Sequence, residues 1–209
     1  MKLQFPSPMK STICLALLLA LGSLAQAQEA IPLEEAQKAA RKLIATIGTA
    51  SDLPFAMEAD VERPAGLKGG EAGVIVLPDK TLNAAAIAAA GKTFVPVGQL
   101  WSLKVTLASG GRGFSSDKLR LVSVGDGERT REVQFFLLGV VKNEQGALEL
   151  AVFGKGAEPL YRVALQKAGS GSQNLPLELT GTKTGEESAR LTLSVLGQYT
   201  ADLDLVKAD

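Results

Sequence analysis

The pattern of apolar and polar positions divides the chain into one helical stretch and a long series of strand-like runs. Between about Pro32 and Ile47, apolar residues recur at steps of three and four, which gathers them on one face of a helix. Pro32 suits the first helical position, and Gly48 suits the position after the last turn. The apolar stripe is narrow and rich in alanine. We therefore expect residues 28–50 to form one amphipathic N-terminal helix packed on a sheet.

From Phe55 onward the repeat changes to two residues, which is the period of a half-buried strand. The run Val133–Val141 is apolar on both faces, so it predicts a central strand that is covered on both sides. The expected strands are Phe55–Glu62, Val74–Leu77, Trp101–Leu107, Leu119–Val124, Val133–Val141, Leu148–Val152, Tyr161–Leu165, Leu175–Leu179, Leu191–Val195 and Tyr199–Leu205.

Turn-forming clusters, among them Ala65–Gly70 and Ser109–Ser116, separate these runs. Only Leu82–Ala90 has the composition of a further helix, with Thr81 as its N-cap. A parallel sheet would need a helix between most strands. We therefore predict a mainly β fold, an antiparallel β-sandwich over residues 51–209, with a small β-barrel as the alternative.

The first 27 residues have the three parts of a secretory signal. Lys2 and Lys10 precede an apolar run from Ile13 to Leu21, and small residues ending in Ala25-Gln26-Ala27 follow. The run is about half of the roughly 20 residues that span a bilayer. We expect cleavage after Ala27, with Ala25 and Ala27 as the recognised positions. The mature protein is then expected in the periplasm or outside the cell, with no further membrane span.

Composition limits the chemistry of the mature chain. The signal contains two lysines, no acid and the single cysteine, so the remainder holds 20 basic and 22 acidic residues. Such a balance does not indicate nucleic-acid binding. Histidine is absent from the whole sequence, which removes the commonest general base and the commonest metal ligand. We expect no cofactor and no metal site, and the interpretation leans away from an enzyme.

Two groups of carboxylates could still carry chemistry. Asp202 and Asp204 lie two residues apart on an expected strand, and Glu58, Asp60 and Glu62 form a similar row. Residues at this spacing share one face of a strand, so a carboxylate-dependent glycan hydrolase is one alternative function. A solvated sheet face explains both rows and is the favoured interpretation, because carboxylates are rarely buried. No catalytic residue is assigned.

The loop Ser109–Ser116 is the candidate binding site. Its glycines allow backbone N–H groups to converge, Arg112 adds positive charge, and Phe114 is placed to insert into a partner. The single tryptophan and both tyrosines, Trp101, Tyr161 and Tyr199, share the phase of apolar neighbours and are expected in the core.

No motif connects the sequence to a known family. Gly91-Lys92-Thr93 resembles the end of a phosphate-binding loop, but it follows a helix, whereas a working loop opens one. The remaining hypotheses are an exported interaction or structural module that binds an envelope protein, and a small barrel that carries an apolar ligand.

Overall fold

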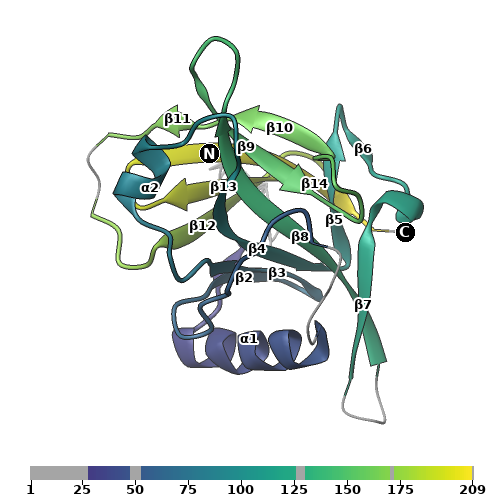
Figure 1. The fold of residues 1–209 in the computed structure, drawn as a ribbon. Helices are drawn as coiled ribbons and strands as arrows, with labels where there is room; N and C mark the ends of the chain where they lie inside the picture. Colours follow the sequence, from purple (N-terminus) through teal and green to yellow (C-terminus); the bar gives the residue numbers. More distant parts are fainter. Residues whose placement is uncertain (1–27, 48–52, 126–129, 170–171, 209) are drawn as a thin grey trace, which may run out of the picture.

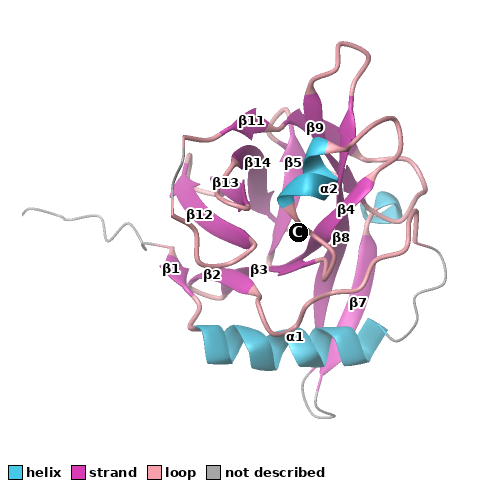
Figure 2. Ribbon diagram, turned by 60° about the vertical axis from the view of Figure 1, so that its left-hand side comes forward, coloured by secondary structure: helices cyan, strands magenta, loops and turns pink. Residues whose placement is uncertain are grey.

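The computed structural model describes residues 28–47, 53–125, 130–169 and 172–208. Two antiparallel sheets face each other, and a helix, α1 (Leu33–Ile47), lies along the side of the first sheet that faces away from the second (Figures 1 and 2). The predicted β-sandwich with one early helix is therefore confirmed. The export signal lies outside the described residues.

The first sheet has eight strands in the order β1-β2-β3-β4-β8-β9-β10, and β7 pairs with the first half of β8. Every neighbouring pair in this sheet is antiparallel. Its strands are β1 (Glu29–Ala30), β2 (Ala65–Gly69), β3 (Ala72–Pro78), β4 (Val95–Leu103), β7 (Arg120–Gly125), β8 (Thr130–Lys142), β9 (Leu148–Phe153) and β10 (Tyr161–Ala164).

The second sheet has six strands in the order β12-β13-β14-β5-β6, with β11 paired to the start of β14. The two sheets do not close into a barrel, so the barrel alternative is wrong. The strands of this sheet are β5 (Val105–Ser109), β6 (Arg112–Gly113), β11 (Gln166–Lys167), β12 (Leu177–Lys183), β13 (Ser188–Val195) and β14 (Tyr199–Lys207).

Strand β8 is buried on both faces, as its apolar pattern predicts. Phe136 and Leu138 face the core between the two sheets, whereas Phe135 and Leu137 face a second core on the outer side of the first sheet. Successive side chains of a strand point to opposite faces, so one apolar run serves both cores. The inter-sheet core is closed near one end by a short helix, α2 (Ala84–Ala88), whose Ile87 is fully buried.

Helix α1 supplies one side of the second core. Ala36, Ala40 and Leu43 are buried in one stripe, and Ala40 and Leu43 pack in a cluster with Trp101 and Phe135. Small side chains in this stripe let the helix approach the sheet closely. Leu33, which the sequence pattern includes in the apolar stripe, is instead exposed.

The expected strand Phe55–Glu62 is wrong. Within residues 53–63 the only sheet-like contact is an isolated bridge between Ala59 and Asp79. Phe55, Met57 and Ala59 are nevertheless partly buried against the second core. Glu58, which lies between Met57 and Ala59, is exposed. The segment is extended and packs beside α1 on the outer face of the sheet. The alternation of apolar and polar residues in this segment arises because one of its sides is buried against the sheet. It does not indicate pairing with a neighbouring strand.

The expected strand Trp101–Leu107 is two strands that belong to different sheets. The chain leaves β4 at Leu103 and enters β5 at Val105, and Lys104 between them has a positive φ of 59°. Such a backbone angle is uncommon for a residue with a side chain and turns the chain sharply. As a result Trp101 packs in the outer core and Leu107 in the inter-sheet core, although the sequence places them in one phase.

Two local expectations also change. The turn assigned to Ala65–Gly70 is largely strand β2, where Gly66 allows close packing: a Cβ there would lie 2.8 Å from Ile31 Cδ1. The N-cap of α2 is Asn83, whose side chain accepts a hydrogen bond from the Ala86 N–H. Thr81 instead donates its hydroxyl to Asp79 Oδ1 at 2.5 Å.

Candidate functional site

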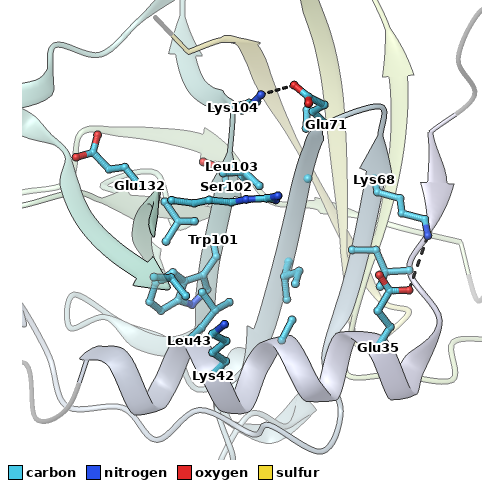
Figure 3. A pocket seen from close by; sticks show the side chains of 18 of the residues that line it. Glu35, Lys42, Leu43, Lys68, Glu71, Trp101, Ser102, Leu103, Lys104 and Glu132 are labelled. Carbon is cyan, nitrogen blue, oxygen red and sulfur yellow. Dashed lines mark hydrogen bonds and ion pairs between the residues drawn. The ribbon is translucent and has the colours of Figure 1, made fainter. Parts of the chain in front are cut away.

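A groove of about 950 Å³ opens on the outer face of the first sheet, beside α1 (Figure 3). Helix α1 forms one wall, and the floor and opposite rim come from β2, β3, β4, β7, β8 and the turn between β2 and β3. Small-molecule sites in proteins typically enclose about 300–1,000 Å³. The groove is therefore large enough to bind a ligand, and it is the candidate site.

The groove exists because α1 covers only part of this face. Ile75, Trp101 and Phe135 point outward from the sheet and pack in the core that α1 closes. Two residues further along their strands, Gly73, Leu103 and Val133 point to the same side and line the groove. A single helix is about 10 Å wide, so this second row is only partly covered: Gly73 and Leu103 are half-buried, whereas Val133 is buried.

Gly73 contributes to the groove by having no side chain. It lies in β3 between Lys68 of β2 and Leu103 of β4. Among the described atoms, a Cβ built at Gly73 would meet only the Leu67 carbonyl oxygen, at an ordinary 3.7 Å. The fold therefore has room for a Cβ at this position, and a side chain carried by it would project into the groove.

Trp101 gives the groove a rigid floor. Its ring lies 4.6 Å from the Phe135 ring, centre to centre, and only 2% of the residue is exposed. The indole N–H donates to Gln99 Oε1 at 3.2 Å, so its polar group is satisfied within the protein. Trp101 is the only tryptophan in the sequence, which makes it a built-in fluorescent reporter for this site.

Charged side chains surround the apolar floor (Figure 3). Lys68 of β2 lies 3.7 Å from Glu35 of α1 and joins the two walls at one end. Lys104 forms an ion pair with Glu71 on the opposite rim. Lys42 rises from α1 toward the groove, and Glu132 of β8 also belongs to its lining. Arg131 of β8 completes the lining charges.

Positive charges on this rim lower the pKa of the Glu71 carboxyl group. The hydrogen bond from Lys104 lowers the pKa of Glu71, and the charges of Lys104 and Arg131 lower it further. Lys104 and Arg131 thus both act on one carboxylate, that of Glu71 in the turn between β2 and β3.

The acidic row Glu58, Asp60 and Glu62 does not form a common face. Glu58 and Glu62 are exposed and pair with Lys80 and Arg41 respectively. Asp60 is buried, accepting the Glu62 N–H at 2.9 Å and Arg63 Nε at 2.6 Å. These three carboxylates therefore hold residues 53–63 in place and do not form a common catalytic or binding site.

A second buried carboxylate, Asp79, holds the same segment from the other side. Its Oδ2 accepts the Glu58 N–H at 2.8 Å, and its Oδ1 accepts the Thr81 N–H at 2.8 Å. Only 2% of Asp79 is exposed. These hydrogen bonds explain how an extended segment without a partner strand keeps one conformation.

Asp60 is expected to make stability depend on pH at the acid end. Burial raises the pKa of Asp60, but hydrogen bonds from Arg63 and the Glu62 N–H, together with the Arg63 charge, lower it more. Because the folded pKa lies below that of the unfolded chain, about 3.9, the stabilisation is present at neutral pH and is lost as pH falls through the folded value. Asp60→Asn should therefore cost about 1–3 kcal/mol at pH 7.

Urea unfolding of the wild type and Asp60→Asn at several pH values checks this expectation. The difference in unfolding free energy should stay constant from about pH 7 to 5 and shrink below about pH 4. The matched control is Asp202→Asn on an exposed sheet face, for which the difference should be small. A gap of constant size down to pH 2 would contradict the role given to Asp60.

The predicted binding loop divides into a hairpin and a packed aromatic residue. Gly110 and Gly111 have φ values of 60° and 77° and form the two-residue turn between β5 and β6. Arg112 is exposed. Phe114 is half-buried, and its ring stacks on Tyr161 with centres 5.4 Å apart. Neither Arg112 nor Phe114 lines the groove, and their binding role stays a prediction.

Asp202 and Asp204 lie on the exposed face of β14. Asp202 accepts a hydrogen bond from the Thr192 hydroxyl at 2.6 Å, and Asp204 accepts one from Arg190 Nε at 3.3 Å. Both partners lie on the adjacent strand β13. The two carboxylates therefore belong to a surface network away from the groove, which agrees with the favoured interpretation of a solvated face.

Tyr161 and Tyr199 pack against the inter-sheet core. Burial raises the pKa of Tyr161, and the nearby charge of Asp204 raises it further. The Tyr161 hydroxyl has no hydrogen-bond partner among the described residues. The tyrosine therefore stays neutral over the physiological pH range and acts as a packing residue.

Sequence reasoning missed the groove because its lining comes from segments that are far apart along the chain. Glu35 and Arg131 are nearly a hundred positions apart, yet both line it. One signal was present: the cluster Lys68-Gly69-Gly70-Glu71 places small and charged residues at a strand end.

The described part of the chain contains no group of three or more acidic residues, histidines or cysteines placed to bind a metal ion. No helix among the described residues is long and apolar enough to cross a membrane. Comparison with protein-family models, with curated proteins and with solved structures finds no match to this chain.

Proposed function

We propose that this protein is an exported, non-catalytic binding module, and that the groove beside α1 is its ligand site. The observation that carries the proposal is a rigid apolar floor with a partly open row beside it, bordered by charged side chains. Binding sites typically combine a largely apolar lining with a few placed polar groups. A site that is already formed loses little entropy when a ligand enters.

Export is supported by the tripartite pattern of residues 1–27 and by where the sheet begins. Glu29 and Ala30 already pair with β2, and Ile31 packs on Gly66. A cut after Ala27 therefore leaves every described strand of the sheet complete. N-terminal sequencing of protein recovered from the cell envelope should read Gln28-Glu29-Ala30, and an intact Met1 terminus would contradict export by this signal.

The absence of histidine from the sequence, and of cysteine beyond the signal, supports a non-catalytic role. The groove is preferred to the Ser109–Ser116 loop as the binding site because Phe114 already packs on Tyr161 and on the inter-sheet core. Binding a partner through Phe114 would require that contact to break.

Filling the groove tests the proposal directly. Gly73→Phe places an aromatic ring over the row formed by Leu103 and Val133, so binding of the neutral apolar dye Nile red should weaken by at least about tenfold, which is about 1.4 kcal/mol. Dye fluorescence and quenching of Trp101 both measure this. The free energy of unfolding should change by less than about 0.5 kcal/mol, because the fold has room at this position.

The matched control is Gly91→Phe, which adds the same ring outside the groove. A Cβ at Gly91 would meet no described atom within 4 Å. This variant should bind Nile red as the wild type does. Equal binding by the wild type and Gly73→Phe, with both proteins folded, would rule out the groove as the site.

A further inference from the structure

The first sheet has a gap in its ladder at one end of the groove. Strand β4 pairs with β8 only as far as Ser102, which lies opposite Gln134. Beyond that point the chain turns at Lys104 and enters the second sheet, whereas β8 extends back to Thr130. Strand β7 occupies one edge of Thr130–Val133. Among the described residues, no strand pairs with the other edge of this stretch.

This free edge presents hydrogen-bonding groups of the backbone. The Lys142 N–H donates to the Gly91 carbonyl oxygen at 2.8 Å, on the side of β8 that faces away from β9. In an antiparallel sheet, alternate residues direct both N–H and C=O to the same edge. Strand β8 keeps a regular alternation along its length, since the one register shift lies in β4. Thr130 and Glu132 therefore direct both of their backbone groups into the gap.

The gap has the width of one strand. Elsewhere in the sheet β4 lies between β3 and β8, so the two banks are two strand spacings apart, about 10 Å. Glu71 and Ala72 on one bank, and Arg131 and Glu132 on the other, line the same groove. A strand that belongs to another folded sheet would bring a neighbouring strand into the space of the opposite bank. The gap therefore suits an extended segment without a sheet of its own.

The two faces of the gap differ in polarity. On the outer face, Leu103 and Val133 belong to the apolar floor of the groove. On the inner face, where β4 stops, Ser102 Oγ and Gln134 Oε1 are buried and have no hydrogen-bond partner among the described residues. Because side chains alternate between the faces of a strand, a segment in the gap would place apolar residues outward and polar residues inward. Lysine, arginine and glutamate all line the groove, so net charge does not select the ligand.

We propose that the groove binds an extended segment of another protein, which adds to the free edge of β8 as an antiparallel strand in line with β4; this inference rests on the groove being the binding site. The backbone of the segment bonds to the N–H and C=O groups of Thr130 and Glu132. Its apolar side chains lie over Leu103 and Val133. In strand addition, main-chain hydrogen bonds supply affinity and alternate side chains supply specificity.

The first test uses a short fluorescein-labelled peptide in which valine and threonine alternate. Residues directly opposite each other in an antiparallel pair share one face, so the threonines lie opposite Thr130 and Glu132 and direct their N–H groups to β8. N-methylation of every threonine should weaken binding at least about tenfold, measured by fluorescence anisotropy. N-methylation of every valine should change binding by less than about threefold, because those N–H groups face away from β8.

Two proline variants test the same edge from the side of the protein. Glu132→Pro removes an N–H that faces the gap, so it takes no hydrogen bond from the ladder with β7. Ser123 lies opposite Glu132, so its N–H points to the outer edge of β7, and Ser123→Pro is the matched control. Peptide binding should weaken at least about tenfold in Glu132→Pro and stay unchanged in Ser123→Pro. Proline is tolerated where its N–H faces away from the ladder, so the urea midpoints of the two variants should agree.

The outcomes separate the two proposals. If neither the peptide nor Nile red binds, the groove is not a ligand site and both proposals fail. If Nile red binds and Gly73→Phe abolishes it, but the peptide does not bind, the groove stands and strand addition is wrong. Equal binding of the two methylated peptides also overturns strand addition, and this comparison holds even if Glu132→Pro does not fold.

Two further results would assign the edge to a different occupant or place. If Ser123→Pro loses the peptide and Glu132→Pro keeps it, the segment adds to β7 and the inference is overturned. If sedimentation shows that the wild type is a dimer and Glu132→Pro is a monomer, a second copy of the chain occupies the edge, which also overturns it.

Discussion

Replacing Phe136 with alanine is expected to lower the free energy of unfolding by about 3–5 kcal/mol, as is usual for a large aromatic residue deleted from a packed core. Phe136 is fully buried and lies opposite Leu100 of β4 in the core between the sheets. Leu100 and the neighbouring Leu138 are also fully buried, so the cavity would lie inside the packed core. A loss of this size is a large fraction of the stability of a typical domain.

Urea unfolding followed by far-UV circular dichroism measures the change. The control is Leu33→Ala on α1, where the side chain is 46% exposed and the cost should be below about 0.5 kcal/mol. A loss of less than about 1 kcal/mol for Phe136→Ala would mean that the inter-sheet core is not packed as described. If the variant does not fold at all, Phe136→Leu provides a smaller deletion with the same expected direction.

Adding one methyl group at Gly98 is expected to be almost as damaging, at about 3 kcal/mol or more. A Cβ there would lie 2.4 Å from the Leu77 carbonyl oxygen and 2.9 Å from Leu177 Cδ1. The first contact is with the backbone of β3, which pairs with β4 from Gly73 to Pro78. The oxygen cannot move away without disturbing that ladder, and β4 already shifts its register on β8 between Pro96 and Gly98.

The comparison of Gly98→Ala with Gly73→Ala isolates this steric cost. Both glycines lie in adjacent strands of the same sheet, but a Cβ at Gly73 approaches nothing closer than 3.7 Å among the described atoms. Gly73→Ala should therefore be neutral or slightly stabilising, because alanine restricts the unfolded chain more than glycine does. Equal effects at the two positions, measured by the midpoint of thermal unfolding, would contradict the close approach of β3 and β4.

Much of the architecture was predictable from local pattern. The apolar residues on both faces of Val133–Val141 correctly indicated a central strand, because only a strand with a layer on each side can bury both. The helical period after Pro32 located α1 to within one residue at its start. Both signals come from periods of 2 and 3.6 residues, which the backbone itself imposes.

Other local patterns were ambiguous, because burial and strand pairing are separate properties. Phe55 and Met57 alternate with exposed neighbours as a strand would, yet they belong to an extended segment without a partner strand, which Asp60 and Asp79 hold in place. The run from Trp101 to Leu107 keeps one phase in sequence, although the chain turns at Lys104 and sends its two halves to different sheets. Both arrangements give the same alternation of apolar and polar residues as a single paired strand, so this pattern alone does not distinguish them.

The candidate site was not predictable from the sequence, although the burial of one of its residues was. Trp101 was correctly expected to be buried, but its role as the floor of a groove depends on α1 leaving the next row partly uncovered. Arg112 and Phe114 could be predicted as binding residues because they lie in one glycine-rich loop. Lys42 and Arg131 lie on separate elements that meet only at the groove.

The sequence by itself determined the class of this protein: mainly strands, one early amphipathic helix, and a composition without the residues of imidazole chemistry. Only the tertiary structure decided where a ligand could bind. The physical reason is that periodicity reports which side of an element is buried, whereas a groove depends on how wide the covering helix is and on which residues of neighbouring strands it leaves open.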